Sequence, residues 1–455
     1  MDRISNLPDE IIHHIGSFLS AKEAAFATLL SKRWRNLFTI VPKLRFNNGS
    51  AKSFKDFVDD VVLPLPVNSR VRKFSLKCKY VPDIEDLINR CLLHVVNRGV
   101  MCLQLQIEVD REEHYSLPTH VFTCKTVSTM KLGSGFVIEA LPADVSLPAL
   151  KSLFLDSVRF LGGVDGRYCA FKTLLSASPV LRELVMNGNE WGKWCRTVSS
   201  TTLQRLTIRR EDFDPYEEGI IDDDPYEFDN VSFETPALTY LDYSDYVPKE
   251  YPTVNLDSLV EANLNLCADV EGVWQKEHAN TFNPMNLIIG FKNVEIFNLT
   301  IEAVEMFGVF NETIPMFEKV SQLSLSLSNF CWFSVPNLMK KFPNLKTLII
   351  EDSLHYEYHS TDEVICQCVS GYSFLLSCPV EVLKINCYDG SVEELEQMKH
   401  FLGKLSCLEL VEVRAKAASR DAKLKIMADL LMLPRASTKC KVKVKLFTNT
   451  TLLRG

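Results

Sequence analysis

The stretch PALKSLFL, residues 148–155, shows the pattern that decides the fold of this 455-residue chain. It holds a hexad in which the first, fourth and sixth residues are apolar, namely Leu150, Leu153 and Leu155. Alternate side chains of a strand point to the same face, so Leu153 and Leu155 lie together on one buried face. The proline before the hexad ends any preceding helix and favours an extended backbone. The stretch therefore predicts a short strand that is buried on one side.

The same hexad recurs along the chain. Its thirteen copies begin at Val71, Val100, Val127, Leu150, Leu181, Leu203, Leu238, Leu259, Val294, Val320, Leu345, Val380 and Leu408. Successive copies start 21 to 35 residues apart, which is close to the leucine-rich-repeat period but irregular. Each strand would stack in parallel on the next, with the return segments as the outer wall. We therefore predict an α/β fold, an irregular leucine-rich-repeat solenoid shaped as a horseshoe.

The segment before these repeats is predicted to be three short helices. Residues 7–20, LPDEIIHHIGSFLS, begin a helix at Pro8 with two carboxylates in its first turn. At 100° per residue its apolar side chains fall in one arc of about 140°. A capping box at Ser20 starts a second helix, and residues 31–41, SKRWRNLFTIV, give a third. Because so small a unit cannot bury all its apolar surface, part of that surface needs a partner.

Residues 2–38, DRISNLPDEIIHHIGSFLSAKEAAFATLLSKRWRNLF, resemble the F-box of plant F-box proteins, above all in LPDEII, KEAA and LSKRWR. Ser20 departs from the family, which usually has proline there. F-boxes dock on the Skp-type adaptor of SCF (Skp, cullin, F-box) ubiquitin ligases, and through it on cullin and RING subunits. The resemblance implies that the adaptor is contacted by Leu7, Pro8, Ile11, Ile15, Leu19, Leu30, Trp34 and Leu37.

Later segments such as FKDFVDDVVL and LPTHVFTCKTVSTMKL resemble the leucine-rich region of plant F-box/LRR proteins. The end of the chain resembles the FBD (F-box and BRCT-associated) module, although the usual tryptophan-rich opening is missing. The predicted organisation has four parts. They are an F-box (1–48), a helical connector (49–70), leucine-rich repeats (71–375) and an FBD-like C-terminal segment with a cap (376–455).

Composition excludes several classes of function. A net charge of -8 argues against a broad nucleic-acid interface, which needs clustered cations. The N-terminus lacks the pattern of a signal peptide, and no apolar run is long enough to span a bilayer. We expect a protein of the nucleus or cytoplasm, or of both, without membrane contact. Its 14 cysteines are then expected to be mostly reduced, buried, small apolar residues.

Two segments raise the question of metal or charge chemistry. Residues 211–234 carry eleven carboxylates and fit either a solvated loop or an acidic lip that recruits a basic substrate. His355, His359, Cys366 and Cys368 match no zinc-finger spacing, so we expect a loop and no metal there. Elsewhere GxSxG, P-loop and HExxH motifs are missing, so we predict no catalytic residues and no cofactor.

The lysines of the closing strand, Lys439 to Lys445 in alternation, fit either protection of a sheet edge or a basic binding strip. Together these features predict a non-catalytic substrate-recognition subunit, whose F-box binds the adaptor and whose repeats bind a protein for ubiquitination. Two alternatives remain at this point. One is an adaptor-bound scaffold without a degradation target, and the other is a receptor for a small, hormone-like molecule.

Overall fold

A computed structural model describes most of the chain. The described residues are 7, 11, 15, 27, 34, 40–47, 50–65, 69–108, 115–133, 136–138, 141–160, 169–188, 197–210, 230–267, 282–327, 332, 335–352, 354, 375, 378–416 and 420–447. They form two compact units. Unit 1 comprises residues 1–212 and 233–236, and unit 2 comprises residues 213–232 and 237–455.

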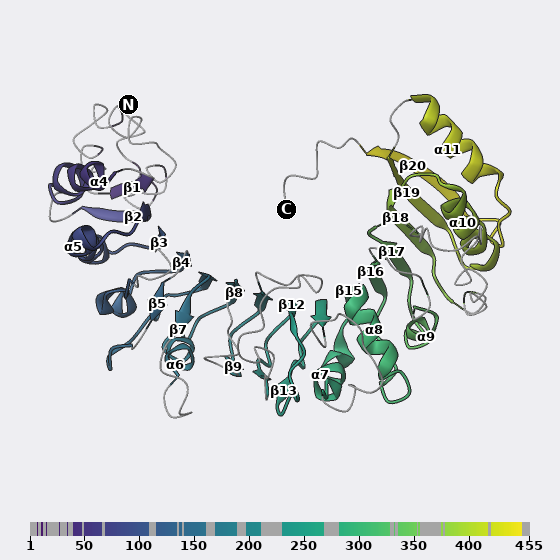
Figure 1. Cartoon of the computed structure of the whole chain (residues 1–455), viewed down its shortest axis with the longest axis horizontal. Coiled ribbons are helices and arrows are strands. Elements are labelled where there is room, and N and C mark those ends of the chain that lie inside the picture. Colours follow the sequence, from purple (N-terminus) through teal and green to yellow (C-terminus); the bar gives the residue numbers. More distant parts are fainter. Residues whose placement is uncertain are drawn as a thin grey trace. The chain divides into compact units, whose positions relative to one another are not determined.

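Unit 1 is built on a sheet of parallel strands, each hydrogen-bonded to the next in chain order (Figure 1). Its strands are β1 (Ile40–Asn47), β2 (Arg70–Lys79), β3 (Cys102–Glu108), β4 (Thr129–Gly133), β6 (Ser152–Asp156), β8 (Glu183–Asn187) and β10 (Arg205–Arg209). The short strands β5 (Val137–Ile138) and β7 (Arg159–Phe160) pair with each other. The return segments contain α4 (Ala51–Phe57), η2 (Val58–Val62), η3 (Pro82–Ile84), α5 (Glu85–Val96), η4 (Thr119–Thr123), α6 (Ala170–Ser176) and β9 (Thr197–Ser199).

Unit 2 repeats this plan with another run of parallel strands. They are β12 (Tyr240–Tyr246), β14 (Glu261–Cys267), β15 (Ile296–Thr300), β16 (Gln322–Ser326), β17 (Thr347–Ile350), β18 (Val382–Tyr388), β19 (Leu410–Lys416) and β20 (Lys441–Phe447). The other elements are β13 (Val254–Asn255), α7 (Met285–Gly290), η6 (Phe291–Asn293), α8 (Ile301–Val309), α9 (Val335–Met339), α10 (Val392–Lys404) and α11 (Arg420–Met432). The strand β11 (Ser232–Glu234) lies where the sequence passes between the units.

The hexad pattern is confirmed as the origin of these sheets. Every one of the thirteen hexads overlaps a strand, and in twelve the strand begins at the third residue. The leading apolar residue lies just before the strand and is buried there, as Leu150 and Leu345 are. The fourth and sixth residues then point into the core, as Leu153 and Leu155 do. The irregular spacing is absorbed by return segments that differ in length and type.

The strand β1 corrects the predicted third helix, which was expected to run to Val41. The backbone is instead extended from Ile40, and β1 pairs in parallel with β2. Pro42 has no amide hydrogen for a helical bond, and the preceding residues are β-branched, which favours a strand. Leu44 and Phe46 are buried. VPKLRF, residues 41–46, is therefore a fourteenth copy of the hexad, and it lies inside the range predicted as the F-box.

Helices cover one side of each sheet. In unit 2, α8 packs on β14, β15 and α9, and Figure 1 shows α8 and α9 on the same side of the strands. The ring of Phe297 is the centre of the core below them. It makes edge contacts with four other aromatic rings, at centroid distances of 5.5 to 6.2 Å, from Phe291, Phe307, Phe317 and Phe342. The opposite side of each sheet carries the residues between the buried ones, and we call it the polar face.

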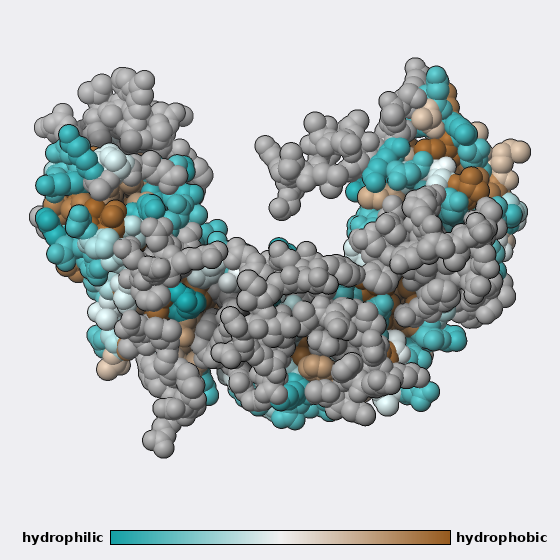
Figure 2. Space-filling model, in the orientation of Figure 1, coloured by the Kyte–Doolittle hydropathy of each residue, from teal (hydrophilic) through white to brown (hydrophobic). Residues whose placement is uncertain are grey.

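The last helix of unit 2 is apolar on two sides. Ile426 and Leu430 are buried, whereas Leu424 and Leu431 are exposed and Met432 is 85% exposed. Figure 2 shows apolar residues at the surface beside hydrophilic ones in the region of α10 and α11. Within the described part of the chain, no helix is both long and apolar enough to cross a membrane.

Candidate functional site

Four of the eight residues predicted to contact an adaptor can be placed in the structure. Ile11, Ile15 and Trp34 are helical, and Leu7 lies in a bend before them. The other four residues lie outside the described part of the chain, namely Pro8, Leu19, Leu30 and Leu37. The adaptor-binding role of all eight stays a prediction.

The placed residues do not share one surface. Trp34 is only 3% exposed and packs with Ala27, and Leu7 and Ile15 pack against this pair. Ile11 is 45% exposed. The helical arc that was expected to face a partner is therefore divided, because Leu7 and Ile15 turn toward Trp34 while Ile11 remains in solvent. Ala27 was not singled out in the sequence, although it is the small residue on which the indole packs.

The polar face of unit 2 carries a ladder of uncharged hydrogen-bonding groups. The Asn263 amide donates to the Tyr240 hydroxyl at 2.8 Å, and the Asn298 amide donates to Asn263 on the neighbouring strand. One row further along the strands, the Thr300 hydroxyl donates to the side-chain carbonyl oxygen of Asn265 at 3.0 Å. The pairing register of β14 and β15 sets Asn298 directly opposite Asn263. These contacts fix the side chains in place on an accessible face.

The ladder becomes acidic at the end of β17. The Glu351 carboxylate accepts from the Ser324 hydroxyl at 2.7 Å and from the Asn386 amide at 2.6 Å, so it links three neighbouring strands. Ser326 donates to Asp352 beside it. Each carboxylate is therefore held by a neutral donor, and its charge is not neutralised by these contacts.

The last strands of unit 2 and the turn after β18 carry ion pairs between neighbouring strands. Lys416 lies 3.8 Å from the Asp389 carboxylate, and Glu412 lies 4.0 Å from Lys443 and 3.7 Å from Lys445. These groups are at least partly exposed, so each pair adds little to stability. The cations of β20 outnumber the carboxylate that they face, so positive charge remains at this end of the sheet.

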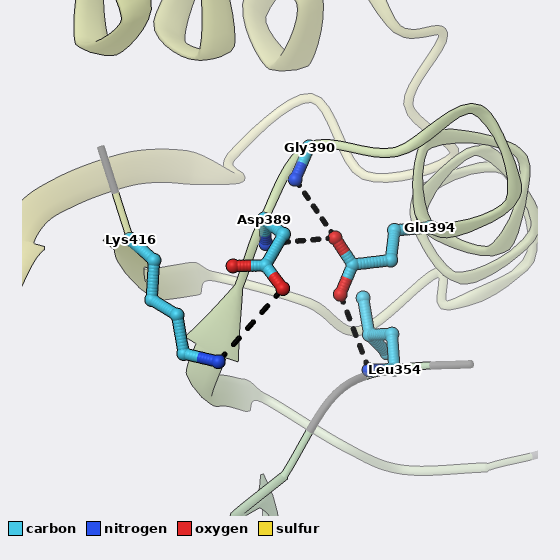
Figure 3. A network of polar contacts seen from close by, with 5 residues as sticks. All are labelled: Leu354, Asp389, Gly390, Glu394 and Lys416. Carbon is cyan, nitrogen blue, oxygen red and sulfur yellow. Dashed lines mark hydrogen bonds and ion pairs between the residues drawn. The ribbon is translucent and has the colours of Figure 1, made fainter. Parts of the chain in front are cut away.

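A buried carboxylate in unit 2 accepts hydrogen bonds from backbone amides of two separate segments (Figure 3). Glu394, only 2% exposed, accepts the backbone amides of Asp389 and Gly390, both at 2.8 Å, and the amide of Leu354 at 3.4 Å. Gly390 has a φ of 78°, which favours glycine and aims both turn amides at the carboxylate. Burial raises the pKa of the Glu394 carboxyl, and the amide donors oppose that rise. Ser391 completes the cap of α10 by accepting the amide of Glu394 at 3.2 Å.

A tryptophan binds the other backbone polar group of Leu354, its carbonyl. The Trp332 indole donates to the Leu354 carbonyl at 2.9 Å, and its ring lies 5.2 Å from that of Phe401 on α10. Both backbone polar groups of Leu354 are therefore bound, one by Trp332 and one by Glu394. We call these four residues the Leu354 lock. Its role is structural, since every member is buried and the bonds are internal.

Metal binding or nucleophilic chemistry would need suitable side chains among the described residues. There, no set of three or more His, Cys, Asp or Glu side chains is arranged to bind a metal. His355, His359, Cys366 and Cys368 lie outside this part of the chain, as do residues 211–229 of the acidic segment. Burial raises the pKa of the Cys78 thiol to about 12, which makes it a poor nucleophile.

Comparison with known proteins places this architecture in a family. Residues 4–46 match the F-box domain family, and residues 88–226 match the LRR repeats of the FBD-associated F-box protein At5g56370. Neither match is to a family named for a catalytic activity. The FBD-like character of residues 376–455 stays a prediction.

Full-length relatives come from Arabidopsis thaliana. F-box/LRR-repeat protein At3g62440 is 54% identical over 469 residues, covering 98% of this chain and 100% of the relative. Putative F-box/LRR-repeat protein At5g15620 is 51% identical and covers 98% of this chain and 99% of the relative. F-box/LRR-repeat protein At2g42720 is 37% identical over 97% of this chain and 99% of the relative. The chain belongs to the plant F-box/LRR-repeat protein family.

Proposed function

We propose that this chain is the substrate-recognition subunit of an SCF-type ubiquitin ligase. The F-box binds a Skp-type adaptor, and the polar face of the repeats holds a protein target for ubiquitination. The F-box match over residues 4–46 carries this proposal, and the exposed Ile11 supports it as an apolar contact for a partner. The contribution of the chain is proximity, because it holds the target near a loaded ubiquitin-conjugating enzyme. We also propose that the chain is located in the nucleus or the cytoplasm, the compartments that those ligases require.

The polar face suits a protein target. Asn265, Thr300 and Asn386 present amides and hydroxyls, which can bind the backbone or polar side chains of a polypeptide. Their internal hydrogen bonds hold them in fixed positions before binding, which lowers the entropy cost of association. Repeat sheets of this kind offer an extended surface on which different side chains can be placed without disturbing the core.

Ile11 gives a test of adaptor binding that is separate from folding. Ile11→Asp puts a charge where an apolar contact is expected, and should weaken binding by about 2 kcal/mol or more, about 30-fold in Kd. Val61 is 43% exposed, nearly the same as Ile11, but it lies on η2 beyond the F-box. Val61→Asp is therefore the matched control, and it should leave binding unchanged. Equal binding by wild type and both variants in a titration with purified adaptor would contradict the proposed contact.

Trp34→Ala should also reduce adaptor binding, by about 2 to 4 kcal/mol, as truncation of a buried aromatic anchor does. Because Trp34 packs inside its own chain, this loss includes unfolding of the local helices. Circular dichroism of Ile11→Asp and Trp34→Ala separates the two effects. Ile11→Asp should keep the wild-type helix signal, whereas Trp34→Ala should lose part of it.

A reconstituted ligase tests the remaining step. Proteins captured from plant extract by the chain should gain ubiquitin when adaptor, cullin, RING subunit and conjugating enzyme are added. The Ile11→Asp variant should capture the same proteins without modifying them. If captured proteins never gain ubiquitin while the adaptor is bound, the chain acts as a scaffold and the proposed receptor role is wrong.

A further inference from the structure

The first strands of unit 1 concentrate positive charge on one face. On the polar face of β1 and β2, alternate positions hold five cations, Lys43, Arg45, Lys73, Lys77 and Lys79. The buried residues between them, such as Phe74 and Leu76, point to the opposite side. We call these five cations the basic strip. The whole chain carries a net charge of -8, so the strip reverses the sign of the molecule locally.

Cations of the basic strip lie close enough to repel one another. Register sets Lys43 directly opposite Lys73, on strands about 4.8 Å apart. Like charges placed directly opposite each other destabilise a sheet. Among the residues described on β1 to β3, Glu108 is the one carboxylate on this face, and it pairs with Lys77 at 3.7 Å. A repulsive arrangement of this kind becomes favourable when an anionic partner covers it.

Protection of the sheet edge does not account for the strip. β1 is the first strand in the sheet order, so Lys43 and Arg45 could serve to block pairing with another chain. β2, however, lies between β1 and β3 and has no free edge. Lys77 pairs with Glu108, but Lys73 on β2 needs another explanation.

The neighbouring strands favour a polypeptide as the anionic partner. Gln104 and Gln106 follow on β3 and present side-chain amides that can bind peptide groups. On the next strands Lys131 lies over the Phe154 ring at 4.0 Å, and Val185 is half-buried in the same row. This row offers a cation at Arg45, an amide at Gln104, a second cation at Lys131 and then an apolar step. A phosphodiester backbone could use the cations and the amides but not the apolar surface beside them.

We propose that the basic strip and the row beside it bind an acidic segment of a partner protein, with an apolar residue after the run of carboxylates. Asp and Glu side chains of the segment would pair with the strip, and the apolar residue would lie against Phe154 and Val185. This site lies on the sheet of unit 1, and its occupation does not depend on adaptor binding.

Fluorescence anisotropy on the full chain tests the proposal. The probe is a labelled peptide of eight Asp and Glu residues followed by two Leu, and its all-Gln analogue is the reference. Wild type should bind the acidic probe at least tenfold more tightly than the reference, and rising salt should weaken that binding. Lys43→Glu with Arg45→Glu should weaken it about tenfold, and Lys73→Gln with Lys77→Gln should also weaken it. The first pair is exposed on an edge strand, so the fold should be retained.

The matched control makes the same charge change elsewhere on unit 1. Lys151 and Lys172 are exposed and lie outside the strip, so Lys151→Glu with Lys172→Glu should change Kd less than twofold if the strip is the site. Equal weakening by the control would overturn the proposal, because it would show a response to net charge alone. Failure of wild type to bind the probe would overturn it too. Tighter binding of an oligonucleotide or of anionic vesicles than of the peptide would show that the partner class is wrong.

Discussion

The Leu354 lock predicts that Glu394→Ala loosens unit 2 at one defined point. The substitution removes the acceptor of three backbone amides, of which the two at 2.8 Å belong to Asp389 and Gly390. A hydrogen bond to a charged group contributes about 1.5 to 3 kcal/mol, but these two residues are exposed, so water replaces much of the loss. The Leu354 residue is fully buried, and an unpaired buried amide costs about 1 to 3 kcal/mol.

Relief of the buried charge offsets part of this loss, because burial raises the pKa of the Glu394 carboxyl. The net decrease in local stability should then be about 2 to 4 kcal/mol. Hydrogen exchange of the full chain measures it, and the amide of Leu354 should exchange about 30- to 1,000-fold faster. In this variant Trp332 still donates to the Leu354 carbonyl. Its fluorescence should therefore change when the segment around Leu354 opens.

Glu396 supplies the matched control on the same helix. Its carboxylate pairs with Lys399 at 3.1 Å on the surface, and a pair of this kind contributes about 0.3 to 0.5 kcal/mol. Glu396→Ala should therefore leave the Leu354 amide protected. If both variants gave the same exchange rate at Leu354, the carboxylate would not be what holds this part of unit 2, and the reasoning would be refuted.

Three other perturbations test separate parts of the structure. Burial, and then the Glu302 carboxylate, raise the Glu305 pKa from 4.5 to about 7. The contribution of this carboxyl to folding stability is therefore fully present below pH 4.5 and is lost as the pH rises through 7. Glu305→Gln should therefore raise the melting temperature at pH 8 but not near pH 4.5. Gly290→Ala would put a Cβ 2.6 Å from a Val254 methyl and should cost about 1 to 3 kcal/mol in urea unfolding. Iodoacetamide at pH 8 should label the exposed Cys407 in the native chain and the buried Cys78 only after unfolding, as mass spectrometry of tryptic peptides would show.

The sequence predicted the sheets because one pattern was repeated many times. Each hexad is short, but apolar residues at the first, fourth and sixth places are enough to define a strand that is buried on one side. The copy at 41–46 was missed because its first residue was assigned to the helix that contains Trp34. Pro42 within the copy was the signal that could have ended that helix.

The polar face could have been predicted in part. Asn263 and Asn298 both occupy the fifth place of their hexads, so alignment of the hexads sets them opposite each other, as the pairing register shows. The Leu354 lock could not be found this way. It joins Leu354 to Glu394, 40 residues later, across a return segment whose path no local pattern determines.

The F-box surface was predicted only as a set of apolar residues. A helical wheel showed that Leu7, Ile11 and Ile15 share an arc, but the arc is too wide to say which of them face inward. The answer depends on where Ala27 and Trp34 pack, which is a tertiary contact. Tertiary contacts of this kind decide which apolar side chain stays exposed and can contact a partner.

The position of β1 has a practical consequence for protein engineering. The match to the F-box family ends at residue 46, but Leu44 and Phe46 already belong to the repeat core and β1 already pairs with β2. A chimera joined after residue 46 would carry β1 from the other protein, and the side chains of that strand would not fit those of β2. Grafts that exchange ligase-docking modules between such proteins should instead be spliced ahead of Ile40, so that the recipient keeps its own opening strand.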